Sequence, residues 1–123
     1  MVLYQIRIVV EENKFDEFVD TLLQMSKKIC NEEGCLDFNL YSDIEKEDAY
    51  ILLVEWKTLQ KMEKHFKRKL FSTLIGMTKV LGSDFDIKIN EILEKGTYTL
   101  VQEKIALAPQ RRKKKKARKH QQT

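Results

Sequence analysis

The spacing of hydrophobic residues changes several times along the chain, and the order of these changes is the strongest constraint on its fold. Residues 3–10, 36–41, 50–56 and 85–90 alternate apolar and polar side chains or are apolar throughout, which is typical of β-strands. Residues 15–30 and 58–81 instead carry apolar side chains at i, i+3 and i+4, which predicts one buried helical face in each segment. Strands and helices are therefore expected to alternate along one chain of 123 residues.

Turn and capping residues set the expected ends of these elements. Asn13 and Thr58 can cap the two helices, while Gly34 and Gly82 end them. A turn at residues 94–96 predicts a short fifth strand, residues 97–101. The order is β-α-β-β-α-β with one extra strand, which indicates an α+β fold of the ferredoxin-like type. We expect one domain, residues 1–108, and a tail, residues 109–123.

One face of the expected sheet has no helix to cover it. The strands place Leu3, Val9, Ile51 and Leu53 on this face, opposite the side that the helices cover. Exposed apolar surface of this kind marks an interaction site, and a second copy of the same sheet is its simplest cover. The pattern therefore predicts a homodimer.

Positive charge is concentrated at the end of the chain. Without the eight basic residues of its last thirteen positions, 15 basic residues face 19 acidic ones, so the rest of the chain is mildly acidic. The tail could bind nucleic acid or an anionic surface weakly, or remain solvated without a partner. It has no aromatic residue for stacking on bases, so no sequence preference is implied. The candidate polyanion-binding residues are Arg111, Arg112, Lys113, Lys114, Lys115 and Lys116.

The remaining composition favours a cytoplasmic protein. The N-terminal segment has no basic region or cleavage site of a signal peptide, and no apolar run approaches the ~20 residues needed to span a bilayer. Cys30 and Cys35 are then expected to be reduced, as packing residues or as a redox pair. A zinc site would need these two with His65 and His120, one of them from the tail, so no metal is expected.

The corner around Gly34 and the segment after the third strand resemble a known family. The run EEGCLDFNLY, a polar loop, and then ILLVEWKTLQKMEKHF are similar to the antibiotic biosynthesis monooxygenase (ABM) family of dimeric α+β barrels. The matching positions are Glu32, Gly34, Cys35, Trp56 and His65, and the resemblance covers about residues 1–92. The Gly-Cys corner and the Trp-to-His spacing are most similar to the quinol monooxygenase-like branch.

This resemblance implies a monooxygenase that needs no cofactor and oxidises a small electron-rich aromatic such as a quinol or phenol. Of the site residues of anthrone-type members only Trp56 matches, because Leu52 and Met62 replace an Asn and a Tyr. Haem degradation is a further alternative in the family, but its Asn, Trp and His positions hold Ile6, His65 and Ile75 here. A non-catalytic binding or regulatory dimer, recruited by its basic tail to a polyanion, is the competing class of function.

Five side chains are candidates for a site in such an enzyme. His65 is the expected general base, because imidazole titrates near neutral pH; a packing histidine is the alternative. Trp56 would line the pocket or belong to the core. Arg7 would stabilise an anion or pair with Asp37 or Glu55. The expected substrate-binding residues are Trp56, Arg7, Met62 and Asn39.

Overall fold

The computed structural model describes residues 1–107, which fall into two units. The first unit comprises Met1–Ile92, and the second begins at Leu93. The predicted basic tail lies outside the described residues, as do its candidate polyanion-binding residues from Arg111 to Lys116. The predicted domain end at residue 108 therefore stays a prediction.

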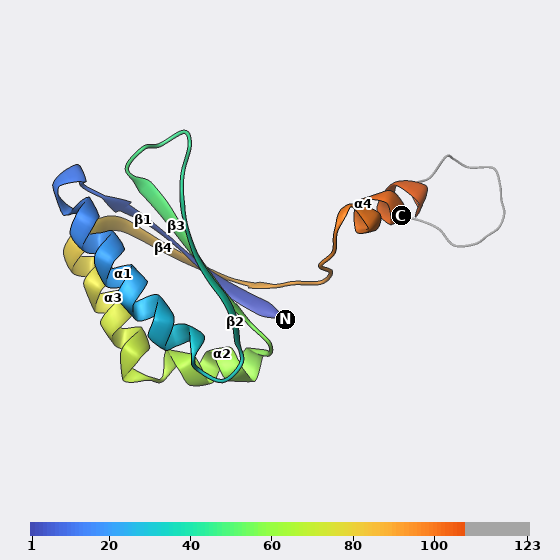
Figure 1. Cartoon of the computed structure of the whole chain (residues 1–123), viewed down its shortest axis with the longest axis horizontal. Coiled ribbons are helices and arrows are strands. Elements are labelled where there is room, and N and C mark those ends of the chain that lie inside the picture. Colours follow the sequence, from blue (N-terminus) through green and yellow to red (C-terminus); the bar gives the residue numbers. More distant parts are fainter. Residues whose placement is uncertain (108–123) are drawn as a thin grey trace. The chain divides into compact units, whose positions relative to one another are not determined.

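The first unit is an antiparallel sheet covered by helices, which confirms the predicted ferredoxin-like α+β fold. Its strands lie in the order β2-β3-β1-β4, and Figure 1 shows α1, α2 and α3 on one face of the sheet. None of the helices within residues 1–107 is long and apolar enough to cross a membrane. The elements are β1 (Val2–Val10), the 3-10 helix η1 (Glu12–Lys14), α1 (Phe15–Cys30), β2 (Cys35–Ser42), β3 (Ala49–Trp56), α2 (Leu59–Phe66), α3 (Lys69–Leu81) and β4 (Gly82–Glu91).

The core lies between the sheet and its three helices. Alternate residues of β1 and β3 point toward the helices, as the alternation predicts, and burial of this apolar surface stabilises the unit. The opposite face carries Leu3, Ile51 and Leu53, which are half-buried. The largest buried side chains of the core are Trp56, Tyr4, Phe18, Ile6, Ile8, Leu22, Ile29, Met62 and Leu74.

Two predicted helix boundaries are wrong. Asn13 lies inside η1, and α1 has Lys14 at its N-cap without a side-chain cap. The helix expected from Thr58 to Leu81 with a basic break at residues 67–69 is two separate helices, because the chain becomes extended at Arg68 within that break. Thr58 does cap α2, since its hydroxyl accepts from the Lys61 N–H at 3.2 Å.

The predicted fifth strand, residues 97–101, is also wrong, because the second unit contains a helix there, α4 (Tyr98–Leu107). The Thr97 carbonyl accepts from the Leu100 N–H at 3.0 Å, and the Thr97 hydroxyl accepts from the Thr99 N–H at 3.4 Å. Such local bonds start a helix, and the Leu, Gln, Glu, Lys and Ala residues that follow favour its continuation. Lys104 pairs with Glu94 in the same unit.

A bulge at Leu36 changes the predicted faces of β2. Cys35 lies opposite Trp56 and Asp37 opposite Glu55, so Leu36 is the extra residue. Cys35 therefore packs toward the core together with Phe38 and Leu40, although strict alternation places it on the other side. Leu36 is 48% exposed as a consequence.

Candidate active site

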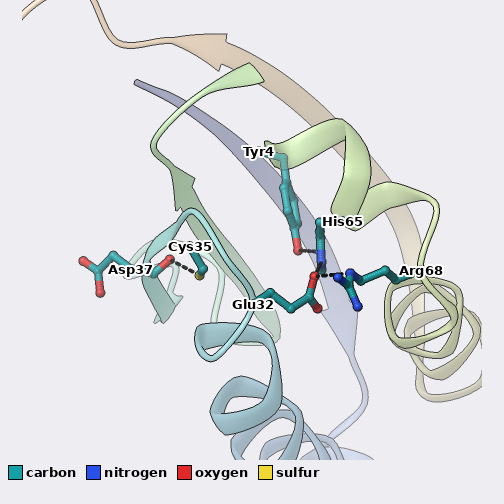
Figure 2. Close-up of polar contacts among 6 residues, drawn as sticks. All are labelled: Tyr4, Glu32, Cys35, Asp37, His65 and Arg68. Carbon is teal, nitrogen blue, oxygen red and sulfur yellow. Dashed lines mark hydrogen bonds and ion pairs between the residues drawn. The ribbon is translucent and has the colours of Figure 1, made fainter. Parts of the chain in front are cut away.

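His65 lies at the centre of a buried chain of hydrogen bonds. Its Nε2 is 2.9 Å from the Tyr4 hydroxyl, and its Nδ1 is 3.0 Å from Oε1 of Glu32. Figure 2 shows Tyr4 and Glu32 approaching the imidazole from two sides. Tyr4 comes from β1, Glu32 from the turn after α1 and His65 from α2. The hydrogen bonds therefore link elements that are far apart in sequence.

Local structure explains how these side chains meet. Thr58 fixes the start of α2, which turns Met62 and His65 inward as its two buried residues. Gly34 has a φ of 91°, a conformation that favours glycine, and its carbonyl accepts from the Lys57 N–H at 2.7 Å. A Cβ at position 34 would lie 2.5 Å from Cβ of Lys61, so the absence of a side chain lets the turn approach α2. This approach brings Glu32 to His65.

The electrostatics of the site favour a neutral His65. Burial lowers its pKa below the ordinary value of 6.5, and this effect exceeds the opposing influence of Glu32. A neutral ring that donates its Nδ1–H to Glu32 has a lone pair on Nε2, so Nε2 accepts a hydrogen bond from the Tyr4 hydroxyl. Burial above all, and the nearby Cys35 and Glu32, raise the pKa of Tyr4, which keeps its hydroxyl protonated. The site therefore holds a basic nitrogen at neutral pH.

Aromatic rings surround the imidazole. The Trp56 ring centroid is 4.5 Å from that of His65, and the Phe71 centroid is 5.2 Å away. Phe66 and Phe71 also contact Tyr4, and these two rings are only half-buried. Tyr4, Trp56 and His65 are at most 1% exposed, so the basic nitrogen lies in an apolar environment.

Two buried polar atoms of the site have no hydrogen-bond partner within residues 1–107: Nε1 of Trp56 and Oε2 of Glu32. The other carboxylate oxygen of Glu32, Oε1, also receives Nε of Arg68 at 3.4 Å. Unpaired buried polar atoms are costly and rare in native structures. The indole N–H is a donor and the carboxylate oxygen an acceptor, so the site offers both kinds of bond to a polar ligand.

The sequence matches one family model, that of the antibiotic biosynthesis monooxygenases, over residues 1–75. The chain belongs to the ABM family. No curated protein sequence matches it significantly. This family membership agrees with the predicted resemblance and with the observed fold.

Solved structures share the ABM fold at low sequence identity. A candidate antibiotic biosynthesis monooxygenase from Deinococcus radiodurans is 19% identical, aligns with 79% of this chain and 97% of its own length, and has a TM-score of 0.72. SnoaB, a cofactor-independent oxygenase from Streptomyces nogalater, is 13% identical over 76% of this chain and 94% of its own, with a TM-score of 0.68. Rv0793 from Mycobacterium tuberculosis is 13% identical over 78% and 98%, with a TM-score of 0.69. At these identities the similarity shows the fold alone.

The ABM fold brings three of the five predicted site residues together. Trp56 and Met62 lie with His65 on the side of the sheet that the helices cover. Arg7 and Asn39 lie on the opposite face, because their pairing partners Ile51 and Leu53 alternate with the buried residues of β3. Arg7 pairs with Asp43 at 3.1 Å, a partner that the sequence did not predict.

Three residues of the site were not predicted from the sequence: Tyr4, Glu32 and Arg68. Tyr4 alternates with apolar residues in β1, so the pattern indicates only a core residue. Glu32 belongs to the corner that resembles the ABM family. This resemblance was the only feature of the sequence that could have indicated a role for Glu32 in the site. Arg68 is visible in the sequence only as part of a basic run.

A cavity lies elsewhere in the described part of the chain, away from the His65 site. The cavity has a volume of about 900 Å³ and includes none of the residues around His65. Within residues 1–107 no group of three or more His, Cys, Asp or Glu side chains is arranged to hold a metal ion. The cavity is lined by Val10, Glu11, Glu12, Phe15, Asp16, Glu47, Asp48 and Tyr50.

Proposed function

We propose that this ABM protein is a monooxygenase that oxidises a small electron-rich aromatic, such as a quinol or phenol, without flavin, haem or metal. The observation that carries the proposal is the neutral, buried His65, whose Nε2 is available as a base through the Tyr4 hydroxyl. Deprotonation is the step that such a substrate needs before it can give an electron to oxygen. The cofactor-independent oxygenase SnoaB, which shares the fold, supports this choice of chemistry.

The proposed reaction begins with proton transfer to His65. The substrate donates a proton to the Tyr4 oxygen, while the Tyr4 hydroxyl passes its own proton to Nε2. The developing oxyanion accepts a hydrogen bond from the unpaired Nε1–H of Trp56. Entry of the substrate requires movement of Phe66 and Phe71, the half-buried rings that cover Tyr4.

Oxygen then reacts with the deprotonated substrate. One electron passes to O2, and the two radicals combine into a peroxide at a substrate carbon that still carries one hydrogen. The imidazolium returns its proton to the outer peroxide oxygen. Loss of water breaks the O–O bond, removes the remaining hydrogen and leaves a carbonyl, so one oxygen atom enters the product and the other leaves as water.

Oxygen uptake tests this proposal. Purified protein should consume oxygen with at least one member of a panel of quinols, anthrones and flavonols, and the rate should be unchanged by a metal chelator. Mass spectrometry under ¹⁸O2 should find one labelled oxygen atom in the product. Absence of uptake across the panel would contradict the enzyme proposal and favour a non-catalytic binding module that its basic tail recruits to a polyanion.

We also propose that the protein is a cytoplasmic homodimer in which a second copy covers the open face of the sheet. Leu53 is half-buried on this face, whereas Leu23 on α1 is 59% exposed. Light scattering should give twice the chain mass of 14.6 kDa. Leu53→Glu should yield monomers and Leu23→Glu should remain dimeric, because only the first places a charge in the interface. A monomeric wild-type protein, or a dimeric Leu53→Glu variant, would contradict this arrangement.

A further inference from the structure

The two cysteines flank the turn that holds Glu32. Cys30 is the last residue of α1 and is exposed, while Cys35 is the first residue of β2 and is half-buried. Two bonds tighten the turn between them. The Glu32 N–H donates to the Ile29 carbonyl at 3.0 Å, and the Cys35 N–H donates to the Glu32 carbonyl at 3.1 Å. The chain therefore reverses its direction within four residues and returns Cys35 toward the end of α1.

The bulge at Leu36 directs the Cys35 thiol inward, toward the site. Burial first, and then the neighbouring Cys30 thiol, raise the pKa of Cys35 to about 12. Cys35 also lies opposite Trp56 in the sheet, and the Trp56 ring packs on His65 with a centroid distance of 4.5 Å. Figure 2 shows the Cys35 thiol pointing toward the Asp37 carbonyl, to which it donates at 3.9 Å. The proposed oxygenase reaction uses neither thiol.

We propose that Cys30 and Cys35 form a reversible disulfide when the protein meets hydrogen peroxide, and that this disulfide alters the His65 site through the turn. The exposed Cys30 reacts first as a thiolate: its sulfur attacks the peroxide O–O bond, which gives a sulfenic acid and, with one proton, water. The Cys35 thiol then attacks the sulfenic sulfur, loses its proton and displaces hydroxide, which leaves as a second water. Two thiols and one peroxide give one disulfide and two waters.

The different surroundings of the two thiols assign their roles. Cys30 is open to solvent, so peroxide reaches it directly. Cys35 is protonated at neutral pH because of its high pKa, so it is the resolving thiol and reacts slowly. A disulfide across this turn constrains Glu32, whose carboxylate orients His65 at 3.0 Å. Oxidation would thus affect His65 through the turn, without a covalent change in any residue that contacts the imidazole.

Intact mass spectrometry tests the disulfide independently of turnover. Reduced full-length protein is treated with hydrogen peroxide, then alkylated under denaturing conditions. The wild-type protein should lose two hydrogens on oxidation and take up no alkyl group. After reduction with dithiothreitol it should regain the two hydrogens. Cys35→Ser should instead hold a Cys30 sulfenic acid that dimedone labels, and Cys30→Ser should keep an alkylatable Cys35. Two alkyl groups on peroxide-treated wild-type protein, or an intermolecular disulfide only, would overturn the proposal.

A second readout tests the link to the site. Trp56 is the only tryptophan of the chain, so its fluorescence reports on the surroundings of His65 without any substrate. The emission should change on oxidation of wild-type protein and return with dithiothreitol, while the Cys30→Ser variant should show no change. An unchanged emission of fully disulfide-bonded wild-type protein would overturn the proposed effect on the site. Neither measurement requires the proposed oxygenase activity. If the protein proves to have no such activity, the disulfide can still be tested.

Discussion

His65→Gln is expected to lower kcat/KM for the oxidation by about 10²–10⁴-fold, the usual contribution of a general base. Glutamine can still donate to Glu32 and accept from Tyr4, so the variant keeps the polar contacts of the buried site. It has no nitrogen that accepts a proton near neutral pH, so deprotonation of the substrate loses its acceptor. The measurement is steady-state oxygen uptake with the best substrate of the panel.

Gln60→Ala is the matched control, because Gln60 is an exposed residue of the same helix and should keep wild-type kinetics. Thermal unfolding of both variants separates loss of the base from loss of the fold. A His65→Gln variant that is folded and has a raised KM with an unchanged kcat would show that His65 contributes to binding only.

Trp56→Ala is expected to lower the free energy of unfolding by about 3–5 kcal/mol, the cost of removing a large ring from a packed core. Trp56 is fully buried, lies opposite Cys35 in the sheet and packs on His65 with a centroid distance of 4.5 Å. The space left by the missing indole ring would also remove the packing that holds the His65 imidazole in place. The measurement is urea unfolding followed by circular dichroism.

Trp56→Phe provides the comparison for this stability effect. Phenylalanine keeps much of the ring and removes only an N–H that lacks an acceptor in the described structure, so it should cost far less than alanine. Under the proposed function the same variant should weaken substrate binding, because the donor for the oxyanion is gone. An equal loss of stability in the two variants would contradict the view that the indole N–H is unpaired.

The fold could be predicted because its information is local. The change from alternating to helical spacing identified β1, α1, β2, β3 and β4, and Gly34 marked the first corner. Residues 97–101 were mispredicted because β-branched residues favour a strand only where a neighbouring strand is available to pair. The bulge at Leu36 was not predictable, because a bulge depends on the pairing register with β3, which the sequence of β2 does not contain.

The site was only partly predictable because it depends on contacts between distant residues. Trp56 and His65 could be chosen from their type and spacing, together with the family resemblance. Tyr4 lies 61 positions before His65, and no local pattern links them. Arg7 and Asn39 were chosen for their chemistry, but their place opposite the site follows from the register of three strands. Charge and polarity identify reactive residues, whereas the pairing of the sheet decides which of them meet.

The most direct test of the central claim is an NMR titration of the His65 imidazole. The two ring nitrogens are followed in ¹⁵N-labelled protein, and His65→Gln assigns the signals, since the chain has only two histidines. Because burial depresses the pKa, the neutral ring should predominate above pH 6.5, with the proton on Nδ1 and an unprotonated Nε2. A midpoint above 6.5, with both nitrogens protonated at neutral pH beside Glu32, would contradict the account, because His65 could then accept no proton.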